Sequence, residues 1–216
     1  MTPPTAFVFD LDGVLTDTAE FHFRAWKRLA DEYGLPFTRE DNEQLRGVDR
    51  RESLRRLLKG KVVSPEQFEA WLTLKNDYYR AFLTELSPTN TLPGVPQFLE
   101  QAKALGLKLG VASASKNAHE VLGKLGILPF FDAIGDGFSV HNAKPAPDLF
   151  VWVAGRLNTP PRDTVIFEDA EAGIDAAIRS GMHSVGIGPI ERVGRADLVI
   201  HGFVDITAAD VVAQLS

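Results

Sequence analysis

Two carboxylates follow an apolar stretch near the start of the chain, where residues 6–13 read AFVFDLDG. The stretch has the apolar character of a strand buried on both faces, yet it ends at Asp10, and Asp12 follows one residue later. A buried carboxylate is unfavourable unless it is paired or bound to a cation. The pair therefore predicts either a polar turn at the end of a strand or a site that binds a cation.

Further polar residues follow later apolar stretches or stand before a predicted helix. Ser113 ends one predicted strand, Glu168 and Asp169 follow another, and Lys144 lies in a loop just before a helix. Because the carboxyl ends of parallel strands meet at one edge of a sheet, we expect these side chains to converge there. Carboxylates suit Mg²⁺, hydroxyls donate hydrogen bonds to phosphate, and a lysine neutralises its charge. The set predicts phosphoryl transfer, in which positioning and charge stabilisation do most of the catalysis.

The elements that must position these residues alternate between strands and helices. Strands are predicted over residues 6–10, 107–113, 133–135, 164–167, 184–187 and 198–200. Helices are predicted over residues 95–105, 118–125, 149–157, 172–180 and 208–215. This alternation is typical of an α/β fold with a doubly wound parallel sheet that helices cover on both faces.

Residues 19–86 differ from the rest, because their apolar side chains recur at helical spacing and no strand pattern is present. Thr38 and Asp41 resemble a helix-capping pair. The sequence SPEQ at residues 64–67 combines a capping serine, a first-turn proline and a capping-box glutamine, and so predicts the start of a helix.

The first strand suits the sheet that follows residue 88 better than it suits the helical block. We therefore predict an inserted helical cap domain over residues 17–87, and an α/β core domain of residues 1–16 and 88–216. The alternative is an N-terminal helical domain beside a separate C-terminal α/β domain, which would separate the first strand from the sheet.

The composition narrows the class of protein. The chain has 216 residues, a formal net charge of −6 and no cysteine, which excludes disulfides, thiolate catalysis and zinc–thiolate sites. The acidic balance argues against nucleic-acid binding, and no apolar stretch approaches the ~18 residues of a membrane span. We expect a cytoplasmic protein that contacts no membrane and is a monomer, because no long apolar stripe remains unassigned.

Other patterns with known chemistry are incomplete in this chain. The two N-terminal aspartates do not begin an EF-hand loop, because Gly13 is out of place and Val14 would occupy position five. No Walker A sequence is present. Gly186 and Gly188 form an isolated GxG, which by itself predicts no site.

The motifs together resemble a known superfamily. The sequence DLDGVL from Asp10, then Ser113, Lys144 with Pro145, and the Glu168–Asp169 pair are similar to the four motifs of the haloacid dehalogenase superfamily. The resemblance runs essentially end to end and includes the helical insertion. Within the superfamily the chain resembles the beta-phosphoglucomutase family, on these stretches: Thr18, HFRAWKRLA from His22, NEQLRGVDR from Asn42, KND from Lys75, ASASKN from Ala112 and KPAPDLF from Lys144.

The resemblance implies a reaction and a set of catalytic residues. The family interconverts beta-glucose 1-phosphate and glucose 6-phosphate through a bisphosphate intermediate, with Mg²⁺ as cofactor. By this resemblance Asp10 is the nucleophile that becomes an aspartyl phosphate, and Asp12 is the general acid and base. The implied metal ligands are Asp10, the main-chain carbonyl of Asp12, Glu168 and Asp169. Ala170 departs from the family, which commonly has serine there, and this puts a hydrogen bond to the metal ligands in doubt.

The resemblance also implies which residues bind the phosphosugar. They are Thr18, His22, Trp26, Gly47, Val48, Arg50, Lys75, Ser113, Ala114, Ser115, Lys116, Asn117 and Lys144. Of these, Ser113, the main chain of Ala114 and Lys144 are implied to hold the transferring phosphate. We further expect the cap to close over the core on hinges near residues 16–18 and 87–89, so that water is excluded.

Three of these residues have a structural alternative. Arg50 suits a second phosphate, but arginines 51, 55 and 56 stand nearby, so it is otherwise a solvated helix charge. Lys75 lies on an apolar stripe and either extends its charge to the edge or points into a site. His22 shares a face with apolar residues and is otherwise a buried core histidine.

The superfamily resemblance alone does not decide the reaction, because most proteins with this core are phosphatases. A mutase differs in needing a second anion site and in keeping water from the aspartyl phosphate. The leading prediction is the phosphomutase. The alternative is a sugar-phosphate or phosphoglycolate-type phosphatase, and the third hypothesis is a binding or regulatory protein on an inactivated core.

Overall fold

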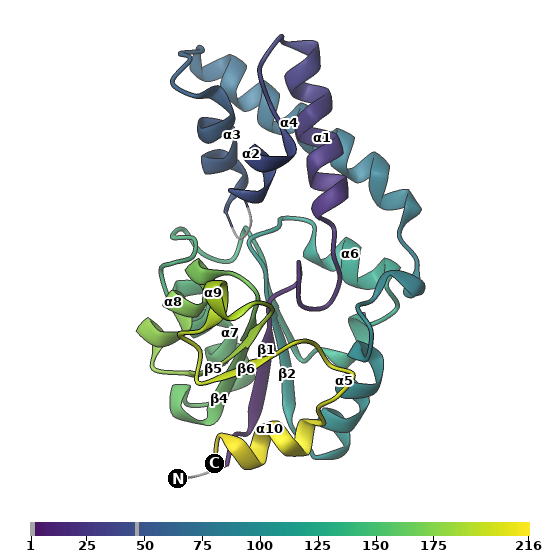
Figure 1. The fold of residues 1–216 in the computed structure, drawn as a ribbon, viewed down its shortest axis with the longest axis vertical. Helices are drawn as coiled ribbons and strands as arrows, with labels where there is room; N and C mark the ends of the chain where they lie inside the picture. Colours follow the sequence, from purple (N-terminus) through teal and green to yellow (C-terminus); the bar gives the residue numbers. More distant parts are fainter. Residues whose placement is uncertain (1–2, 46–47) are drawn as a thin grey trace. The chain divides into compact units, whose positions relative to one another are not determined.

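The computed structural model describes residues 3–45 and 48–216. The chain divides into two compact units: Met1–Asp17 with Ser87–Ser216, here called the core unit, and Thr18–Leu86, here called the helical unit (Figure 1). None of the helices in the described residues has the length and apolar character that a membrane span requires.

In the described part of the core unit, six strands form one sheet in the order β3-β2-β1-β4-β5-β6, and every neighbouring pair is parallel. The strands are β1 (Ala6–Phe9), β2 (Lys108–Ala112), β3 (Ala133–Gly135), β4 (Thr164–Glu168), β5 (His183–Ile187) and β6 (Leu198–Ile200). The chain winds outward from β1 in one direction and then restarts beside β1 with β4. The predicted doubly wound parallel sheet is confirmed, and its crossover point lies between β1 and β4.

Strand β1 is fully buried and presents a different chemistry to each face of the sheet. Phe7 and Phe9 point to one face, where Phe9 stacks on Phe167 of β4 with ring centroids 4.6 Å apart. Phe7 stacks at 6.0 Å on Phe98 of helix α5 (Val95–Ala104). This aromatic cluster holds α5 against the sheet, since each such pair adds about 0.5–1.5 kcal/mol beyond its buried area.

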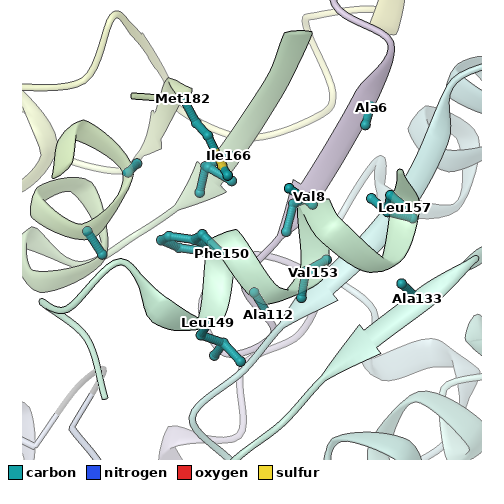
Figure 2. Packing of buried hydrophobic residues seen from close by; sticks show 13 residues of the cluster. Ala6, Val8, Ala112, Ala133, Leu149, Phe150, Val153, Leu157, Ile166 and Met182 are labelled. Atoms are coloured by element: carbon teal, nitrogen blue, oxygen red, sulfur yellow. The ribbon is translucent and has the colours of Figure 1, made fainter. Parts of the chain in front are cut away.

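The opposite face carries small aliphatic side chains and is covered by α7 (Asp148–Leu157) and α8 (Glu171–Ser180). Figure 2 shows Val153 of α7 lying close to the strands. A Cβ atom on Gly110 of β2 would lie 2.6 Å from one methyl of Val153, and one on Gly135 of β3 would lie 2.7 Å from the other. The two glycines therefore allow α7 to pack directly on the backbone of the strands.

Shorter elements complete the core unit. They are α6 (Ala118–Lys124), α9 (Ile190–Val193), α10 (Ala208–Gln214), η2 (Pro88–Asn90), η3 (Leu128–Phe130) and η4 (Pro161–Asp163). Helix α9 was not among the predicted helices, because four residues are too few to display a helical period.

The helical unit contains α1 (Ala19–Glu32), α2 (Arg39–Glu43), α3 (Arg50–Leu58), α4 (Pro65–Phe82) and η1 (Leu83–Glu85). The predicted start of α4 is confirmed, since Ser64 accepts a hydrogen bond from the N–H of Gln67 at 3.2 Å and Pro65 occupies the first turn. The predicted Thr38–Asp41 capping pair is a full capping box at α2. Apolar side chains from α1, α3 and α4 form the unit's own hydrophobic core.

We predict that Gly110→Ala lowers the free energy of unfolding by about 1–3 kcal/mol, because the new methyl overlaps Val153. Val153→Ala should reduce this penalty, which a double-mutant cycle of urea unfolding measures as coupling. Gly155→Ala is the matched control in α7, because nothing lies within 4 Å of its Cβ position, and it should stabilise by about 0.5–1 kcal/mol. Equal effects of the two glycine substitutions would contradict the packing described for α7.

Candidate active site

Three buried carboxylates meet at the carboxyl edge of the sheet. Asp10 follows β1, Glu168 ends β4, and Asp169 is the next residue. Because Phe9 pairs with Phe167 in the ladder, Asp10 lies beside Glu168, and its N–H donates to the Phe167 carbonyl at 2.9 Å. Oxygen atoms of the three carboxylates lie within 4.8 Å of one another. This carboxylate cluster (Asp10, Glu168 and Asp169) unites the three side chains that the sequence grouped as metal ligands.

Lys144 joins two members of the carboxylate cluster. Its Nζ donates to Asp10 Oδ1 at 2.6 Å, to Glu168 Oε2 at 2.8 Å and to the carbonyl of Ala112 at 3.0 Å. These acceptors match the three N–H groups of an ammonium. Burial by itself would lower the pKa of Lys144, but the charges of Asp10 and Glu168 outweigh burial and raise it. Lys144 therefore remains charged at the centre of the site.

The surroundings of Glu168 strongly perturb its carboxyl group. Burial is the largest cause and raises its pKa, the nearby Asp10 and Asp169 raise it further, and Lys144 opposes them; the result is a pKa of about 8. Its other oxygen, Oε1, accepts a hydrogen bond from the N–H of Ala170 at 3.1 Å. A carboxyl group held this far above its usual range is one that a bound cation would return to the ionised form.

Two glycines make room for the carboxylate cluster. Gly13 has a φ of 85°, and a Cβ there would lie 2.3 Å from Asp169 Oδ2. Gly173, in the first turns of α8, would place a Cβ 2.1 Å from Glu168 Oε2. The sequence did not identify Gly173, because nothing in a helical stretch distinguishes a glycine that faces a carboxylate.

Asp12 lies in a short loop that is held by hydrogen bonds between its own backbone groups. The N–H of Gly13 donates to the Thr16 carbonyl at 2.7 Å, and Asp12 forms an isolated β-bridge with Thr16. The Thr16 hydroxyl donates to the Asn90 carbonyl at 2.7 Å. Asp12 is only half-buried, whereas Asp17 is exposed. These bonds fix the backbone of the loop at Asp12, while the Asp12 side chain remains partly accessible to solvent.

The predicted phosphate-binding loop connects β2 to α6 at the same edge. It contains Ser113, Ala114, Ser115, Lys116 and Asn117. The N–H of Ser115 donates to the buried Ser113 hydroxyl at 3.1 Å, and the N–H of Asn117 donates to the Ser115 hydroxyl at 3.2 Å. Lys116 Nζ lies 4.6 Å from the ring centre of the exposed Phe138. These bonds turn the chain tightly and gather several N–H and O–H groups at the strand end.

The helical unit contains a second polar cluster, formed by His22 of α1 and Lys75 of α4. Lys75 is 2% exposed, and its Nζ lies 2.8 Å from His22 Nδ1 and within 5 Å of the ring centres of Trp26 and Tyr79. His22 stacks on Tyr79 at 4.2 Å. Lys75 therefore does not extend its charge to solvent. Tyr79 was not predicted as a site residue, although it is four residues after Lys75 and so shares its helix face.

The electrostatics keep His22 neutral. Burial is the largest cause, and the charges of Lys75 and Arg50 add to it, so that the pKa of His22 is well below its usual value. An ammonium has no lone pair, so Nδ1 accepts the hydrogen bond from Lys75 and the histidine proton is assigned to Nε2. Burial also lowers the pKa of Arg50.

The remaining predicted residues of the helical unit lie around these elements. Thr18 is buried just before α1, and its hydroxyl accepts a hydrogen bond from Tyr79 at 3.3 Å. Arg50 begins α3, while Val48 precedes it and donates its N–H to the Leu45 carbonyl at 3.1 Å. Gly47 lies outside the described residues.

The fold and the site define the class of protein. The chain matches the haloacid dehalogenase-like hydrolase family over residues 7–187, and it belongs to that family.

Three similar proteins indicate the branch of the family. The chain is 42% identical over 207 residues to the beta-phosphoglucomutase of Bacillus subtilis (strain 168), with 94% of this chain and 91% of that protein covered. It is 34% identical to a phosphorylated carbohydrates phosphatase of Thermotoga maritima, over 83% of each chain. A crystal structure of beta-phosphoglucomutase from Clostridium difficile superposes with a TM-score of 0.94 at 38% identity, covering 98% of this chain and 97% of that one.

We predict that His22 contributes a loss of stability as the pH falls below the ordinary pKa of histidine, 6.5, while the raised pKa of Glu168 acts in the opposite direction. The folded state keeps His22 neutral and the unfolded chain does not, so unfolding takes up a proton, at a cost in stability of up to about 1.4 kcal/mol per pH unit. His22→Gln should remove this contribution, so that its thermal midpoint falls less than that of the wild type, or rises, as the pH decreases from 7 to 5. His119→Gln, which changes an exposed histidine on α6, should leave the wild-type slope. An unchanged slope in the His22 variant would contradict the assignment of His22 as neutral in the folded state.

Proposed function

We propose that this protein is a beta-phosphoglucomutase, which interconverts beta-D-glucose 1-phosphate and D-glucose 6-phosphate through an aspartyl-phosphate enzyme and a bisphosphate intermediate. The observation that carries the proposal is the similarity to the Bacillus subtilis enzyme, which extends over 94% of this chain and so includes the helical insertion as well as the sheet. Residues 17–87 would serve as the cap domain, and residues 1–16 with 88–216 as the catalytic core.

Mg²⁺ fits the carboxylate cluster by the chemistry of its donors. Three buried carboxylates offer hard oxygen ligands, and Lys144 compensates only part of their charge. We assign the metal to Asp10, Glu168 and Asp169, together with the main-chain carbonyl of Asp12. Bound there, Mg²⁺ would supply positive charge against the oxygens of the transferring phosphate.

Asp10 and Asp12 divide the chemistry between them. The phosphate on Asp10 passes to the 6-hydroxyl of glucose 1-phosphate, whose proton goes to Asp12, and the aspartyl bond to phosphorus breaks. The bisphosphate then presents its 1-phosphate, Asp10 attacks the phosphorus, and the sugar oxygen that leaves takes the proton back from Asp12. Lys144 neutralises the Asp10 carboxylate between the two transfers, and Ser113, Ala114 and Lys144 hold the phosphate.

The phosphate group that does not react needs a cationic site of its own. Arg50 of the helical unit suits this role, since a guanidinium binds phosphate through two parallel hydrogen bonds. Lys75 and the neutral His22 form a preorganised pair in the same unit. The further substrate-binding residues of the proposal are Thr18, Trp26, Gly47, Val48, Ser115, Lys116 and Asn117.

A phosphatase acting on sugar phosphates is the second candidate. The relative from Thermotoga maritima is named a phosphatase of phosphorylated carbohydrates and covers 83% of this chain. A phosphatase uses the same nucleophile but lets water attack the aspartyl phosphate, so the products separate the two functions.

The test supplies the protein with Mg²⁺, beta-glucose 1-phosphate and a trace of glucose 1,6-bisphosphate, and follows glucose 6-phosphate and inorganic phosphate together. Formation of glucose 6-phosphate without free phosphate supports the mutase. Free phosphate alone supports the phosphatase, and the absence of both products from a folded protein would overturn both candidates.

We predict that Asp12→Asn lowers mutase turnover by about 10²–10⁴-fold, because proton transfer to and from the sugar oxygens is lost. The measurement is the rate of glucose 6-phosphate formation at saturating substrate. Asp17→Asn is the matched control, because Asp17 is an exposed carboxylate on the same loop and should leave turnover near the wild-type value. Near-native turnover of the Asp12 variant would eliminate Asp12 as the acid and base.

We predict that Arg50→Ala lowers mutase kcat/KM at least about tenfold more than it lowers hydrolysis of a simple aryl phosphate, which has no second phosphate to bind. Arg51→Ala is the matched control, because Arg51 is the next residue of α3 and forms an exposed ion pair with Glu69. Equal losses in the two assays would show that Arg50 does not bind the second phosphate.

A further inference from the structure

The isolated GxG of the sequence has a structural role at the end of β5. A Cβ on Gly186 would lie 2.6 Å from the Cβ of Val193, so this glycine lets α9 approach the strand. Gly188 has a φ of 122°, and a Cβ there would lie 2.8 Å from Nη2 of Arg192. The two glycines therefore allow α9 and the guanidinium group of Arg192 to pack on the carboxyl end of β5.

Arg192 reaches the carboxylate cluster from α9. Its Nη2 lies 3.7 Å from Asp169 Oδ2, which is an ion-pair distance and longer than a hydrogen bond. In the described part of the chain, the buried Nε of Arg192 has no hydrogen-bond partner. A buried donor without a partner lowers stability, so its presence in a folded protein suggests a role other than local stabilisation. The interaction between Arg192 and Asp169 is therefore electrostatic and not a hydrogen bond, and the packing of α9 on β5 holds the guanidinium in place.

Among the described residues, Lys144 and Arg192 both form ion pairs with the carboxylate cluster. Lys144 forms ion pairs with Asp10 and Glu168, while Arg192 forms one with Asp169. The Arg192 side chain is 36% exposed and Asp169 only 6%, so the guanidinium meets solvent on one side and the carboxylate on the other. The Asp169 carboxylate that pairs with Arg192 would also bind the metal ion. The guanidinium and the metal ion would then lie on the same carboxylate and repel one another.

We propose that Arg192 is a positioning residue that acts through Asp169 and lowers the affinity of the carboxylate cluster for Mg²⁺. The proposal rests on the Mg²⁺ site of the proposed function and adds a residue outside its set. In the absence of Mg²⁺, the same charge offsets the repulsion among the three carboxylates. Arg192 thereby weakens the bound state and stabilises the metal-free state, so that the cluster exchanges Mg²⁺ more readily.

The test is a calorimetric titration of metal-free protein with MgCl₂. Arg192→Gln keeps much of the buried aliphatic stem but removes the charge. It should bind Mg²⁺ about tenfold more tightly, because solvent screens part of the interaction of the half-exposed guanidinium. Arg192→Lys keeps the charge and should stay within about threefold of the wild type. In thermal unfolding, Arg192→Gln should lower the midpoint of the metal-free protein more than that of the Mg²⁺-saturated protein.

Arg195→Gln is the matched control. Arg195 lines the same surface hollow as Arg192, and its substitution by glutamine removes the same charge. Arg195 forms its ion pair with Asp175 and not with the carboxylate cluster. Its affinity for Mg²⁺ should stay within about twofold of the wild type, since an exposed pair contributes little.

Each other outcome is decisive. Unchanged or weaker Mg²⁺ binding in Arg192→Gln overturns the proposal while leaving the metal site intact. Equal tightening in Arg195→Gln also overturns it, because the effect would then be one of net charge. If the wild type binds no Mg²⁺, the proposed metal site fails, and the role of Arg192 fails with it.

Discussion

The ammonium of Lys144 between Asp10 and Glu168 is the interaction on which the site depends. Three carboxylates with oxygens within 4.8 Å of one another would repel strongly in a buried place, and burial would drive protons onto them. Lys144 pairs with two of these carboxylates and satisfies its own three donors in doing so. The partners are 134 and 24 residues away in the chain, so the pairing exists only once β1 and β4 lie side by side.

The sheet is built to deliver these groups without exposing its apolar faces. β1 carries phenylalanines on one face and small aliphatic residues on the other, so helices pack on both sides and β1 occupies the middle. The carboxylates of the cluster then stand at or just beyond the carboxyl ends of the strands. Glycine is required where helix or loop must touch strand or carboxylate, as at Gly13 and Gly110, because any side chain would overlap its neighbour.

Two buried lysines illustrate how environment sets function. Lys144 sits among carboxylates, which raise its pKa and keep it a permanent counter-charge. Lys75 lies against a neutral histidine and two aromatic rings, whose faces attract its positive charge through cation–π interactions. In the proposed function the first neutralises a nucleophile and the second belongs to substrate binding. Arg192 adds a third, half-exposed cation, whose charge bears on metal affinity.

The sequence by itself determined the doubly wound sheet and the carboxyl-edge grouping of Asp10, Ser113, Lys144, Glu168 and Asp169. Apolar runs and the alternation of strands with helices are local signals, and parallel strands bring their ends together whatever their order. Only the tertiary structure decided that Lys75 meets His22, because 53 residues separate them and the packing of α4 on α1 sets which side chains face. The same holds for Gly173 and Arg192, whose roles depend on the close approach of separate elements and therefore leave no periodicity in the sequence.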